Sequence, residues 1–435
     1  MLNLKTAAMG LASVGLLLQM SVGSVSAANP GAAPHGHSKS VCSPQAGKAI
    51  CHAKVLTDPN GRPLIFDKPF STPADTSGSV GYSPQQLHTA YVLPWNSTVR
   101  QTIAIVDAYD HPNVKADLDV FDAQFALGAF PTCSSTITTA CFQRVDQNGK
   151  PSGFTNSDPT AATKWNVETN LDVQAAHAIC LNCKILLVEA FTPNNSDLAT
   201  AENTAARLGA TEISNSFALA EGRLGGVFYP SAFNHAGIAI TASAGDNGAG
   251  PVYPADLNTV VAVGGTRLVL NSNGSYNRES VWGNGVNAPS GSGTGSGCST
   301  LATAHTSAAW WQKTVANWPY TGCGDQRSIA DVAALADPAT GFWVYTSAKD
   351  EFGRFGWQII GGTSLSAPVI AGVFALAGHA ASYTFPAQSV YQHLNQFHDV
   401  TSGSNGTCTY TIMCHGWAGY DGPTGVGTPW GIGGF

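Results

Sequence analysis

The sequence predicts an α/β domain whose mostly parallel central sheet is flanked by helices on both faces. Apolar segments such as 102–109 and 184–191 have few polar interruptions, which is typical of strands buried on both sides. Segments with helical periodicity, such as 113–125 and 197–209, alternate with them, as the crossovers of a parallel sheet require. We find no internal repeat, so we expect a single domain over residues 82–435.

The individual elements follow from local patterns. Ser83-Pro84 predicts the start of the first helix, because proline suits the first helical turn. Later helices are expected where apolar residues recur at i, i+3, i+4 and i+7, and strands where apolar runs are short and rich in Val and Ile. The Gly/Ser-rich segment 286–300 is expected to be a loop within the domain, because strands and the main motif follow it. On these criteria we expect strands at 102–109, 184–191, 211–217, 237–245 and 259–266, and helices at 113–125, 165–179 and 197–209.

The N-terminal region has two parts. Residues 1–27 contain an early lysine, an apolar run and small residues before Ala28, which is the pattern of a secretory signal peptide. Residues 28–81 are rich in Pro, Gly, Ser and His without periodicity, so we expect a short leader or tail with one disulfide. We therefore expect a secreted, extracellular protein.

Composition restricts the partners. No segment after the signal reaches the ~20 apolar residues of a spanning helix, so we expect no membrane attachment. Only 11% of residues are charged, the net charge is −7 and no basic cluster occurs, which argues against nucleic acid and anionic membranes. A charge-poor chain also suits an acidic medium, where its charge changes little. We expect a monomer.

The ten cysteines all follow the signal peptide and lie close together in pairs. An even count in an exported chain favours disulfides, and pairing between sequence neighbours is the simplest pattern. The CxxC at 180–183 could instead be redox-active or half of a zinc site, but no second CxxC or His pair accompanies it. We expect the pairs Cys42–Cys51, Cys133–Cys141, Cys180–Cys183, Cys298–Cys323 and Cys408–Cys414.

The helix expected at 165–179 carries two acids on its apolar stripe. Glu168 and Asp172 share this side with Leu171, Ala175, Ala176 and Ile179, while Asn, Thr, Gln and His residues occupy the opposite side. Like charges one turn apart repel, and burying them is costly. A solvated acid pair is the ordinary alternative, but the position on the apolar stripe favours a functional pair.

The segment IIGGTSLSAPVIAGVFALAGHA, 359–380, predicts a strand, a glycine turn and an apolar helix. Ser364 would lie at the helix N-terminus, where the dipole and free N–H groups favour developing negative charge. The alternative is that Ser364 or Ser366 only caps the helix. The pattern GTSxSAPxxAG resembles the active-serine segment of subtilisin-like and sedolisin-like peptidases. The resemblance implies a subtilisin-like fold with Ser364 as the nucleophile.

The chain lacks the HGT-type segment that supplies histidine in subtilisin-like enzymes; His177 lies on the wrong helix side and His235 lacks the flanking pattern. Glu168-x-x-x-Asp172 resembles instead the E-x-x-x-D of bacterial-type sedolisins, the serine-carboxyl peptidases, in which glutamate is the base. Buried, proton-sharing carboxyls have pKa values spread apart, so such a pair can activate serine in acid. The resemblance extends over 82–435, and Asp107 matches a position where some members carry a further acid.

Two further segments resemble parts of a sedolisin site. SAGDNG, 243–248, is similar to the segment whose aspartate donates to the tetrahedral oxygen, which implies that role for Asp246. Only a protonated carboxyl can donate, so this also favours low pH. Without the resemblance, Asp246 would be an ordinary turn residue. Ser216-Phe217-Ala218 stands where the family usually has Ser-Trp-Gly, and we expect this strand edge to pair with extended substrate.

The C-terminal segments FHDVTSG and HGWAGYDGPTGVGTPWG predict one structural calcium ion. Carboxylates and backbone carbonyls on tight turns are the hard oxygen ligands that calcium prefers. The similarity to the sedolisin calcium segment implies these ligands, although tryptophan replaces the family's usual glycine at 417. They are the carboxylates of Asp399 and Asp421 and the carbonyls of Val400, Trp417 and Gly419.

These features predict a secreted acid endopeptidase that hydrolyses protein or peptide substrates through an acyl-enzyme on Ser364. Residues 28–81 are shorter than the folded prodomain usual in the family, so either this leader acts differently or the enzyme folds without an inhibitor domain. Two alternatives remain open. One is a divergent subtilase that uses Asp107, an unidentified histidine and Ser364 at neutral pH; the other is a catalytically silent relative that serves as a secreted binding protein.

Overall fold

The computed structural model describes residues 37–70, 81–151, 154, 164–221, 228–283 and 292–435. All of them belong to one compact unit. The signal peptide expected at 1–27 and the leader residues 28–36 and 71–80 lie outside the described residues. No helix in the described ranges is both long and apolar enough to cross a membrane.

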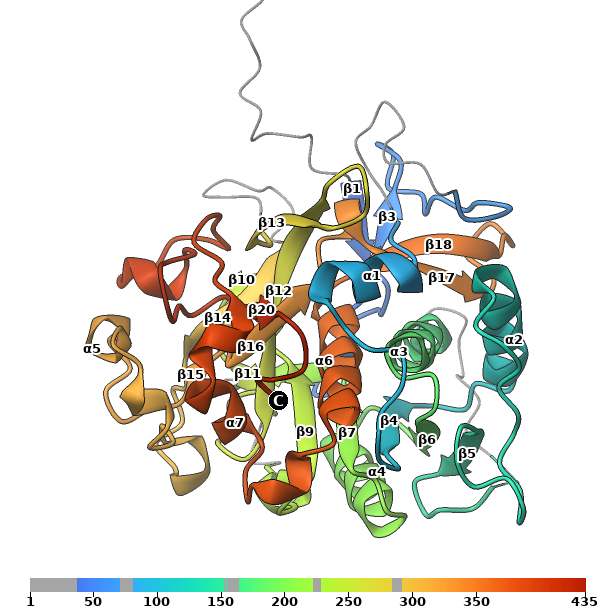
Figure 1. Cartoon of the computed structure of the whole chain (residues 1–435), viewed down its shortest axis with the longest axis horizontal. Coiled ribbons are helices and arrows are strands. Elements are labelled where there is room, and N and C mark those ends of the chain that lie inside the picture. The colour runs from blue at the N-terminus through green and yellow to red at the C-terminus, as the bar shows by residue number, and fades with distance from the viewer. Residues whose placement is uncertain (1–36, 71–80, 152–153, 155–163, 222–227, 284–291) are drawn as a thin grey trace, which may run out of the picture. The chain divides into compact units, whose positions relative to one another are not determined.

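A mostly parallel sheet forms the centre of the fold, which confirms the predicted fold class (Figure 1). Its strand order is β13-β12-β9-β7-β4-β6-β5, and β16 pairs with β12. Only β13 runs antiparallel to its neighbour. The strands are β4 (Thr102–Ala108), β5 (Phe142–Asp146), β6 (Lys184–Ala190), β7 (Glu212–Asn215), β9 (Ala239–Ser243), β12 (Val261–Leu270), β13 (Tyr276–Val281) and β16 (Val332–Leu335).

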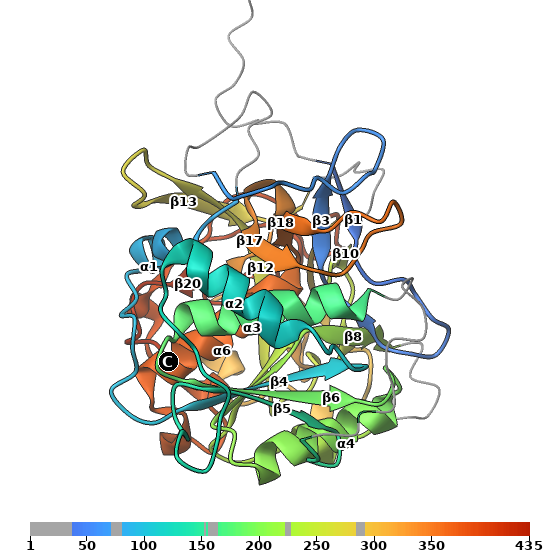
Figure 2. The same cartoon turned by 90° about the vertical axis from the view of Figure 1, so that its right-hand side faces the viewer.

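Helices cover both faces of this sheet (Figure 2). On one face α6 (Thr363–Ala377) lies on the central strands, with α3 (Trp165–Ile179) beside it and α2 (Val114–Phe125) further out. On the other face α4 (Asn195–Arg207) packs on β4 and β6. The first helix, α1 (Pro84–Tyr91), begins at Ser83, whose hydroxyl forms a capping box with Gln86 as the Ser-Pro pattern predicts.

Helix α3 is buried on almost every side, although the sequence predicted one apolar stripe and an opposite polar side. Its polar residues are covered by α2 and by β17 (Phe342–Thr346). Asn170 donates to Asp117 and to Thr346, and Gln174 donates to the carbonyl of Tyr345. The Asn170 and Gln174 amides can be buried there because their N–H groups find acceptors.

The described part of the leader packs into the domain as three short strands, where the sequence showed no strand pattern. β1 (His37–Ser40) pairs with β3 (Lys54–Thr57), which in turn joins β18 in a sheet of order β1-β3-β18-β17. β2 (Ile50–Cys51) joins a separate sheet of order β11-β8-β2.

The remaining elements are β8 (Phe217–Ala220), β10 (Asn247–Ala249), β11 (Val252–Tyr253), β14 (Gly293–Cys298), α5 (Trp318–Thr321), β15 (Ser328–Ile329), β17 (Phe342–Thr346), β18 (Gly356–Gly361), α7 (Ala387–Gln392), β19 (Phe397–His398) and β20 (Thr428–Pro429).

All ten cysteines form disulfides in the predicted pairs. The CxxC is closed as Cys180–Cys183 directly after α3, which agrees with a structural loop clip and leaves no thiolate pair to bind zinc.

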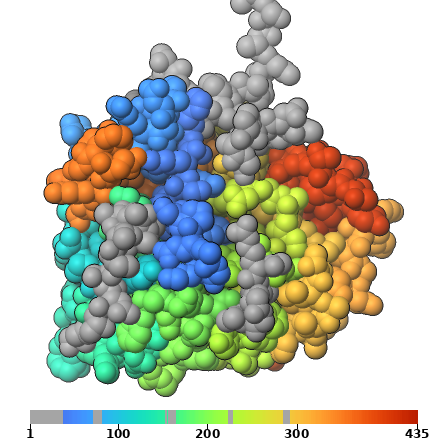
Figure 3. All heavy atoms as spheres, turned by 180° about the vertical axis from the view of Figure 1, so that it is seen from behind, coloured from blue at the N-terminus to red at the C-terminus, as the bar shows by residue number. Residues whose placement is uncertain are grey.

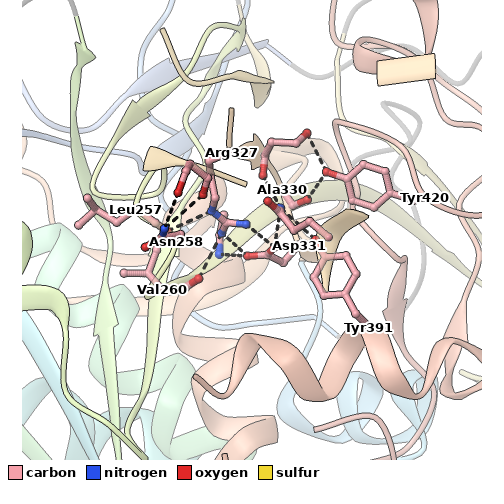
Figure 4. A network of polar contacts seen from close by, with 12 residues as sticks. Leu257, Asn258, Val260, Arg327, Ala330, Asp331, Tyr391 and Tyr420 are labelled. Atoms are coloured by element: carbon pink, nitrogen blue, oxygen red, sulfur yellow. Dashed lines mark hydrogen bonds and ion pairs between the residues drawn. The ribbon is translucent and has the colours of Figure 1, made fainter. Parts of the chain in front are cut away.

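A buried ion pair ties the C-terminal region to the central sheet (Figure 4). Both nitrogens of the Arg327 guanidinium fork contact the Asp331 carboxylate, and the Tyr391 hydroxyl donates to the same carboxylate at 2.7 Å. Tyr420 donates to the carbonyl of Ala330 at 3.0 Å. A bidentate pair with its remaining atoms satisfied fixes the backbone around it. Residues 420 onward are thereby held against β16.

Candidate active site

Ser364 lies in the first turn of α6, with its hydroxyl directed away from the helix end. The residue that caps α6 is Gly362, with φ +94°. The Ser364 hydroxyl donates to the carbonyl of Ser216 at 3.1 Å, and the Ser366 hydroxyl donates to carbonyls of β16. Neither serine therefore caps the helix. The Ser364 N–H has no acceptor within the helix, as is usual in a first helical turn, and it donates to the carbonyl of His52 at 3.2 Å.

Glycine is required before this serine because two polar groups approach the backbone closely. A Cβ at Gly362 would lie 1.9 Å from the carbonyl oxygen of His52 and 2.7 Å from Oδ2 of Asp246. The positive φ would strain any other residue as well. The glycine turn thus brings a carbonyl of the leader and the Asp246 carboxyl to the same place beside Ser364.

Glu168 and Asp172 project from α3, which packs against α6, and both are fully buried. Asp107, at the end of β4, is also fully buried. Among the described residues, no donor meets hydrogen-bond geometry toward any of the six oxygens of these three carboxyls. Three carboxyls in one apolar enclosure cannot all be charged, so they must share protons.

The pKa directions follow from this enclosure. Burial, and then repulsion by Asp107, raises the pKa of Glu168 well above its usual value, while contacts with the Ser364 hydroxyl and the Ala53 N–H act against the rise. Burial, followed by the Asp107 and Glu168 charges, raises the pKa of Asp172. Burial raises the pKa of Asp107 to about 7. The structure thus brings Glu168 to Ser364 and the other two acids to Glu168.

Asp246 follows β9, and its carboxyl reaches the first turn of α6 at Thr363, directly before Ser364. Its Oδ1 accepts from the N–H of Thr363 at 2.8 Å and from the Thr363 hydroxyl at 3.0 Å. Its Oδ2 is buried without a partner in the described structure. Burial raises the pKa of Asp246 to about 6, although the Lys54 charge and Thr363 act to lower it. A proton on this carboxyl belongs on Oδ2, since Oδ1 is already the acceptor of two hydrogen bonds.

The described histidine rings do not provide a substitute base. His177 lies 3.3 Å from the carboxylate of Asp122, on the far side of α3. His52 is close to Ser364 through its carbonyl group, while its ring hydrogen bonds to Ser243 at 2.9 Å. No described histidine ring hydrogen bonds to Ser364. The geometry therefore favours carboxyl chemistry over the Asp–His alternative.

The strand edge at Ser216-Phe217-Ala218 lies beside Ser364, where the sequence placed it. It is not an open edge in this structure, because β2 of the leader pairs with it antiparallel, Ile50 opposite Ala218 and Cys51 opposite Phe217. Sequence reasoning missed these leader residues. A two-residue strand leaves no periodicity to find, and only the nearby cysteine pair marked the segment as structured.

The two carboxylates predicted as calcium ligands, Asp399 and Asp421, lie near enough in the C-terminal loops for their charges to interact. Asp421 is fully buried, and burial and the nearby Asp399 charge raise its pKa. Asp399 accepts from the N–H of Gly419 at 2.9 Å, and the carbonyl of Val400 lies against Gly416. Oδ1 of Asp421 accepts from the N–H and the hydroxyl of Thr424, and Oδ2 accepts from the N–H of Trp417. Carboxylate oxygens such as those of Asp399 and Asp421 are of the kind that could hold a calcium ion. Trp417 itself is half exposed, so its side chain does not obstruct the loop.

Comparison with known proteins agrees with this geometry. The sequence profile of the subtilase family matches residues 160–396. The chain is 28% identical over 394 residues to kumamolisin from Bacillus sp. (strain MN-32), covering 83% of this chain and 64% of kumamolisin. It is 27% identical over 380 residues to sedolisin from Pseudomonas sp. (strain 101), covering 80% of this chain and 60% of sedolisin. The chain thus spans less than two thirds of the length of these curated relatives.

A solved structure extends the likeness to three dimensions. It is a Pseudomonas sedolisin, a serine-carboxyl proteinase, in complex with two molecules of pseudo-iodotyrostatin. The match has a TM-score of 0.65 and 26% identity, and it covers 81% of this chain and 96% of that one. The chain therefore belongs to the subtilase family and is similar, over most of its length, to the sedolisins.

Proposed function

We propose that this protein is a secreted serine-carboxyl endopeptidase that hydrolyses protein or peptide substrates in acid. The main support is that the Ser364 side chain lies near two buried carboxyl groups, one proposed as the base and the other as an oxyanion donor. Ser364 has Glu168 beside its hydroxyl, and Oδ2 of Asp246, which has no hydrogen-bond partner among the described residues, lies close to Gly362. This is the arrangement that acyl transfer needs: a nucleophile, a base and donors for an oxyanion.

In the proposed reaction, Ser364 Oγ attacks the peptide carbonyl carbon while Glu168 accepts the hydroxyl proton. The tetrahedral oxyanion accepts hydrogen bonds from the Ser364 N–H and from the protonated Oδ2 of Asp246. Glu168 then gives its proton to the nitrogen of the leaving amine and the C–N bond breaks. A water molecule repeats the sequence on the acyl ester and regenerates Ser364.

Asp172 and Asp107 have a different role in this proposal. Neither contacts the serine; both repel negative charge on Glu168 and so make it a stronger base. Because the pKa values of all three carboxyls are raised, Glu168 is mostly protonated in acid, and the reactive form is the fraction in which the three carboxyls share one negative charge. Asp246 must be protonated at the same time, and its pKa of about 6 sets the upper limit of the working range.

A calcium ion would support the C-terminal loops rather than the chemistry. The Asp399 and Asp421 carboxylates and the carbonyls of Val400, Trp417 and Gly419 would hold it. The ion would neutralise two carboxylates and fix the loop whose Tyr420 hydroxyl donates to the Ala330 carbonyl beside β16. We also propose that the protein acts as an extracellular monomer; five disulfides are consistent with an oxidising compartment.

The direct test replaces Ser364 by alanine and measures casein digestion at about pH 4, where Asp246 is protonated. We expect a loss of at least ~10³-fold in kcat/KM, as for removal of a nucleophile. Ser366→Ala is the matched control, because this serine lies on the same helix but donates to β16 carbonyls. Undiminished digestion by Ser364→Ala would refute the nucleophile. No acid digestion by the wild-type protein would favour the silent relative, and an optimum near neutrality would favour a histidine-based subtilase.

A further inference from the structure

We propose that Asp256 is a positioning residue that works as a neutral carboxylic acid. It donates a hydrogen bond to the Glu221 carboxylate and so holds β8, the strand whose edge is proposed to bind substrate. The proposal rests on the proposed function and adds the support of its substrate-binding strand. It is carried by the place of β8 between two strands and by two buried carboxyl groups that meet beside it.

β8 is the middle strand of the small sheet β11-β8-β2, so its two edges have different partners. One edge, at Phe217 and Ala218, pairs with β2 of the leader and is the edge proposed for substrate. The other edge pairs antiparallel with β11, where Tyr253 lies opposite Leu219. Figure 3 shows the blue leader directly against the green and yellow-green part of the chain to which β8 and β11 belong. The position of the substrate edge therefore depends on how β11 and its surroundings hold β8.

Two carboxyl groups meet where these strands are supported. Glu221 directly follows β8, and Asp256 lies in the turn after β11. The N–H of Asp256 donates back to the carbonyl of Val252 at 2.9 Å, which returns this residue to its own strand. Its carboxyl lies within hydrogen-bond reach of the Glu221 carboxyl. Asp256 is fully buried and Glu221 is 5% exposed, so water does not separate the two charges.

The hydrogen bonds of this pair require one proton between the two groups. Oε2 of Glu221 accepts from the N–H of Thr300 at 2.7 Å and also from the Thr300 hydroxyl. Oε1 of Glu221 and both oxygens of Asp256 have no donor in the described part of the chain. Two buried carboxylates in contact repel each other and lack solvation. A proton on Asp256 removes one charge and supplies the missing donor to Oε1.

The other charged and titratable groups near Asp256 do not compensate a second negative charge. The Arg327 guanidinium is the cation whose charge favours an ionised Asp256, but its fork is already bound to Asp331. Tyr253 lies close enough to Asp256 and to Glu202 of α4 for their charges to raise its pKa. Burial raises the pKa of Glu202 well above its usual value. The surroundings therefore favour a neutral Asp256.

This arrangement couples the support of β8 to pH. Burial, followed by the hydrogen bond and the charge of Glu221, raises the pKa of Asp256 to about 9. When the contact opens, Asp256 meets water and its pKa returns toward about 4. The pKa of the closed form is the higher one, so closure is fully favoured below about pH 4. Each pH unit from there to about 9 makes opening up to about tenfold easier.

The kinetic test compares wild type, Asp256→Asn and Asp256→Leu as full chains, with kcat and KM on one peptide at about pH 3 and about pH 5.5. Asparagine keeps a donor toward Glu221 and cannot ionise, so we expect the wild-type KM at both pH values. Leucine leaves Oε1 of Glu221 buried without a donor, which is most costly when Glu221 is charged. We expect its KM to rise at least about tenfold near pH 5.5 and much less near pH 3, with kcat within about threefold.

The outcomes separate this proposal from the proposed function. An unchanged KM in Asp256→Leu at about pH 5.5, or an equal rise in Asp256→Asn, would overturn the role of Asp256 and leave the function standing. If the wild-type chain hydrolyses no peptide in acid, the proposed function is refuted, and hydrogen exchange decides on the contact alone.

Hydrogen exchange is measured in a Ser364→Ala background, so that no chain is digested, with Asp256 either kept or replaced by asparagine. With Asp256, we expect protection of the β8 and β11 amides to fall by up to about tenfold per pH unit above about pH 4. With Asp256→Asn this fall should be absent, while the amides between β4 and β6 serve as the internal control in both. The same pH dependence in both chains would contradict the proposal. If Asp256→Leu fails to fold, this comparison still decides.

Discussion

Replacing Asp246 by asparagine should make hydrogen-bond donation to the oxyanion independent of pH. In the structure Oδ1 of Asp246 accepts two hydrogen bonds from Thr363, and Oδ2 has no hydrogen-bond partner in the part of the chain that is described. An asparagine side chain fits this environment in one orientation, with its oxygen toward Thr363 and its NH2 group in place of Oδ2. The amide then donates at every pH, whereas aspartate donates only when it is protonated.

The magnitude follows from the pKa of about 6. With aspartate, the donating fraction falls to about a tenth one pH unit above the pKa and to about a hundredth two units above it. Removal of an oxyanion donor costs ~10²–10³-fold in kcat. We therefore expect Asp246→Asn to be within about tenfold of wild type near pH 4 and to exceed it at pH values well above 6. Asp246→Ala should be weak throughout and should approach wild type at high pH.

The assay is kcat/KM on a fluorogenic peptide from about pH 3 to pH 8, with both variants and wild type. Folding is checked by circular dichroism at each pH. If Asp246→Asn keeps the wild-type decline above pH 6, the group that titrates there is not Asp246, and its role as pH-dependent donor is wrong.

Three further predictions concern Lys54, Glu212 and the proposed calcium site. Removal of the Lys54 charge, as in Lys54→Met, should raise the pKa of Asp246 and move the alkaline decline of kcat/KM to higher pH, because that charge lowers the pKa now. Glu212 is buried with its pKa raised to about 8, so its contribution to stability is complete below its unfolded pKa and is lost as pH rises through 8. From about pH 4.5 to pH 7 this loss is about 3 kcal/mol, and denaturant unfolding should show a flatter pH dependence for Glu212→Gln. Chelation of calcium should lower the Tm of wild type by several degrees and leave that of Asp399→Asn unchanged, since a ligand present at about 100 times its Kd stabilises by about 2.7 kcal/mol.

Much of the fold and site could be predicted because it depends on local patterns. The bounds of α3, 165–179, follow from periodicity, and the structure reproduces them. The acids on its stripe face α6 for the same reason: side chains three and four positions apart share one side of a helix. The disulfides were predictable because each joins cysteines close in sequence.

The features that sequence did not predict depend on contacts between distant segments. The polar side of α3 is buried because β17 covers it, about 170 residues further along the chain, as the bond from Gln174 to Tyr345 shows. β2 has only two residues, and its partner β8 lies far along the chain. Such a strand is defined by the edge that it pairs with, and its own residues carry no period. The pairing of β2 with the strand edge of β8 could therefore be found only in three dimensions.

The most direct test of carboxyl-based proton transfer is the pH dependence of Ser364 acylation, measured by stopped flow with a chromogenic peptide ester. We expect a burst whose rate is greatest in acid, declines above pH 6 with Asp246, and is lost in Glu168→Gln. A burst rate that rises through neutral pH and survives in Glu168→Gln would show that another group takes the serine proton, and would contradict the proposed chemistry.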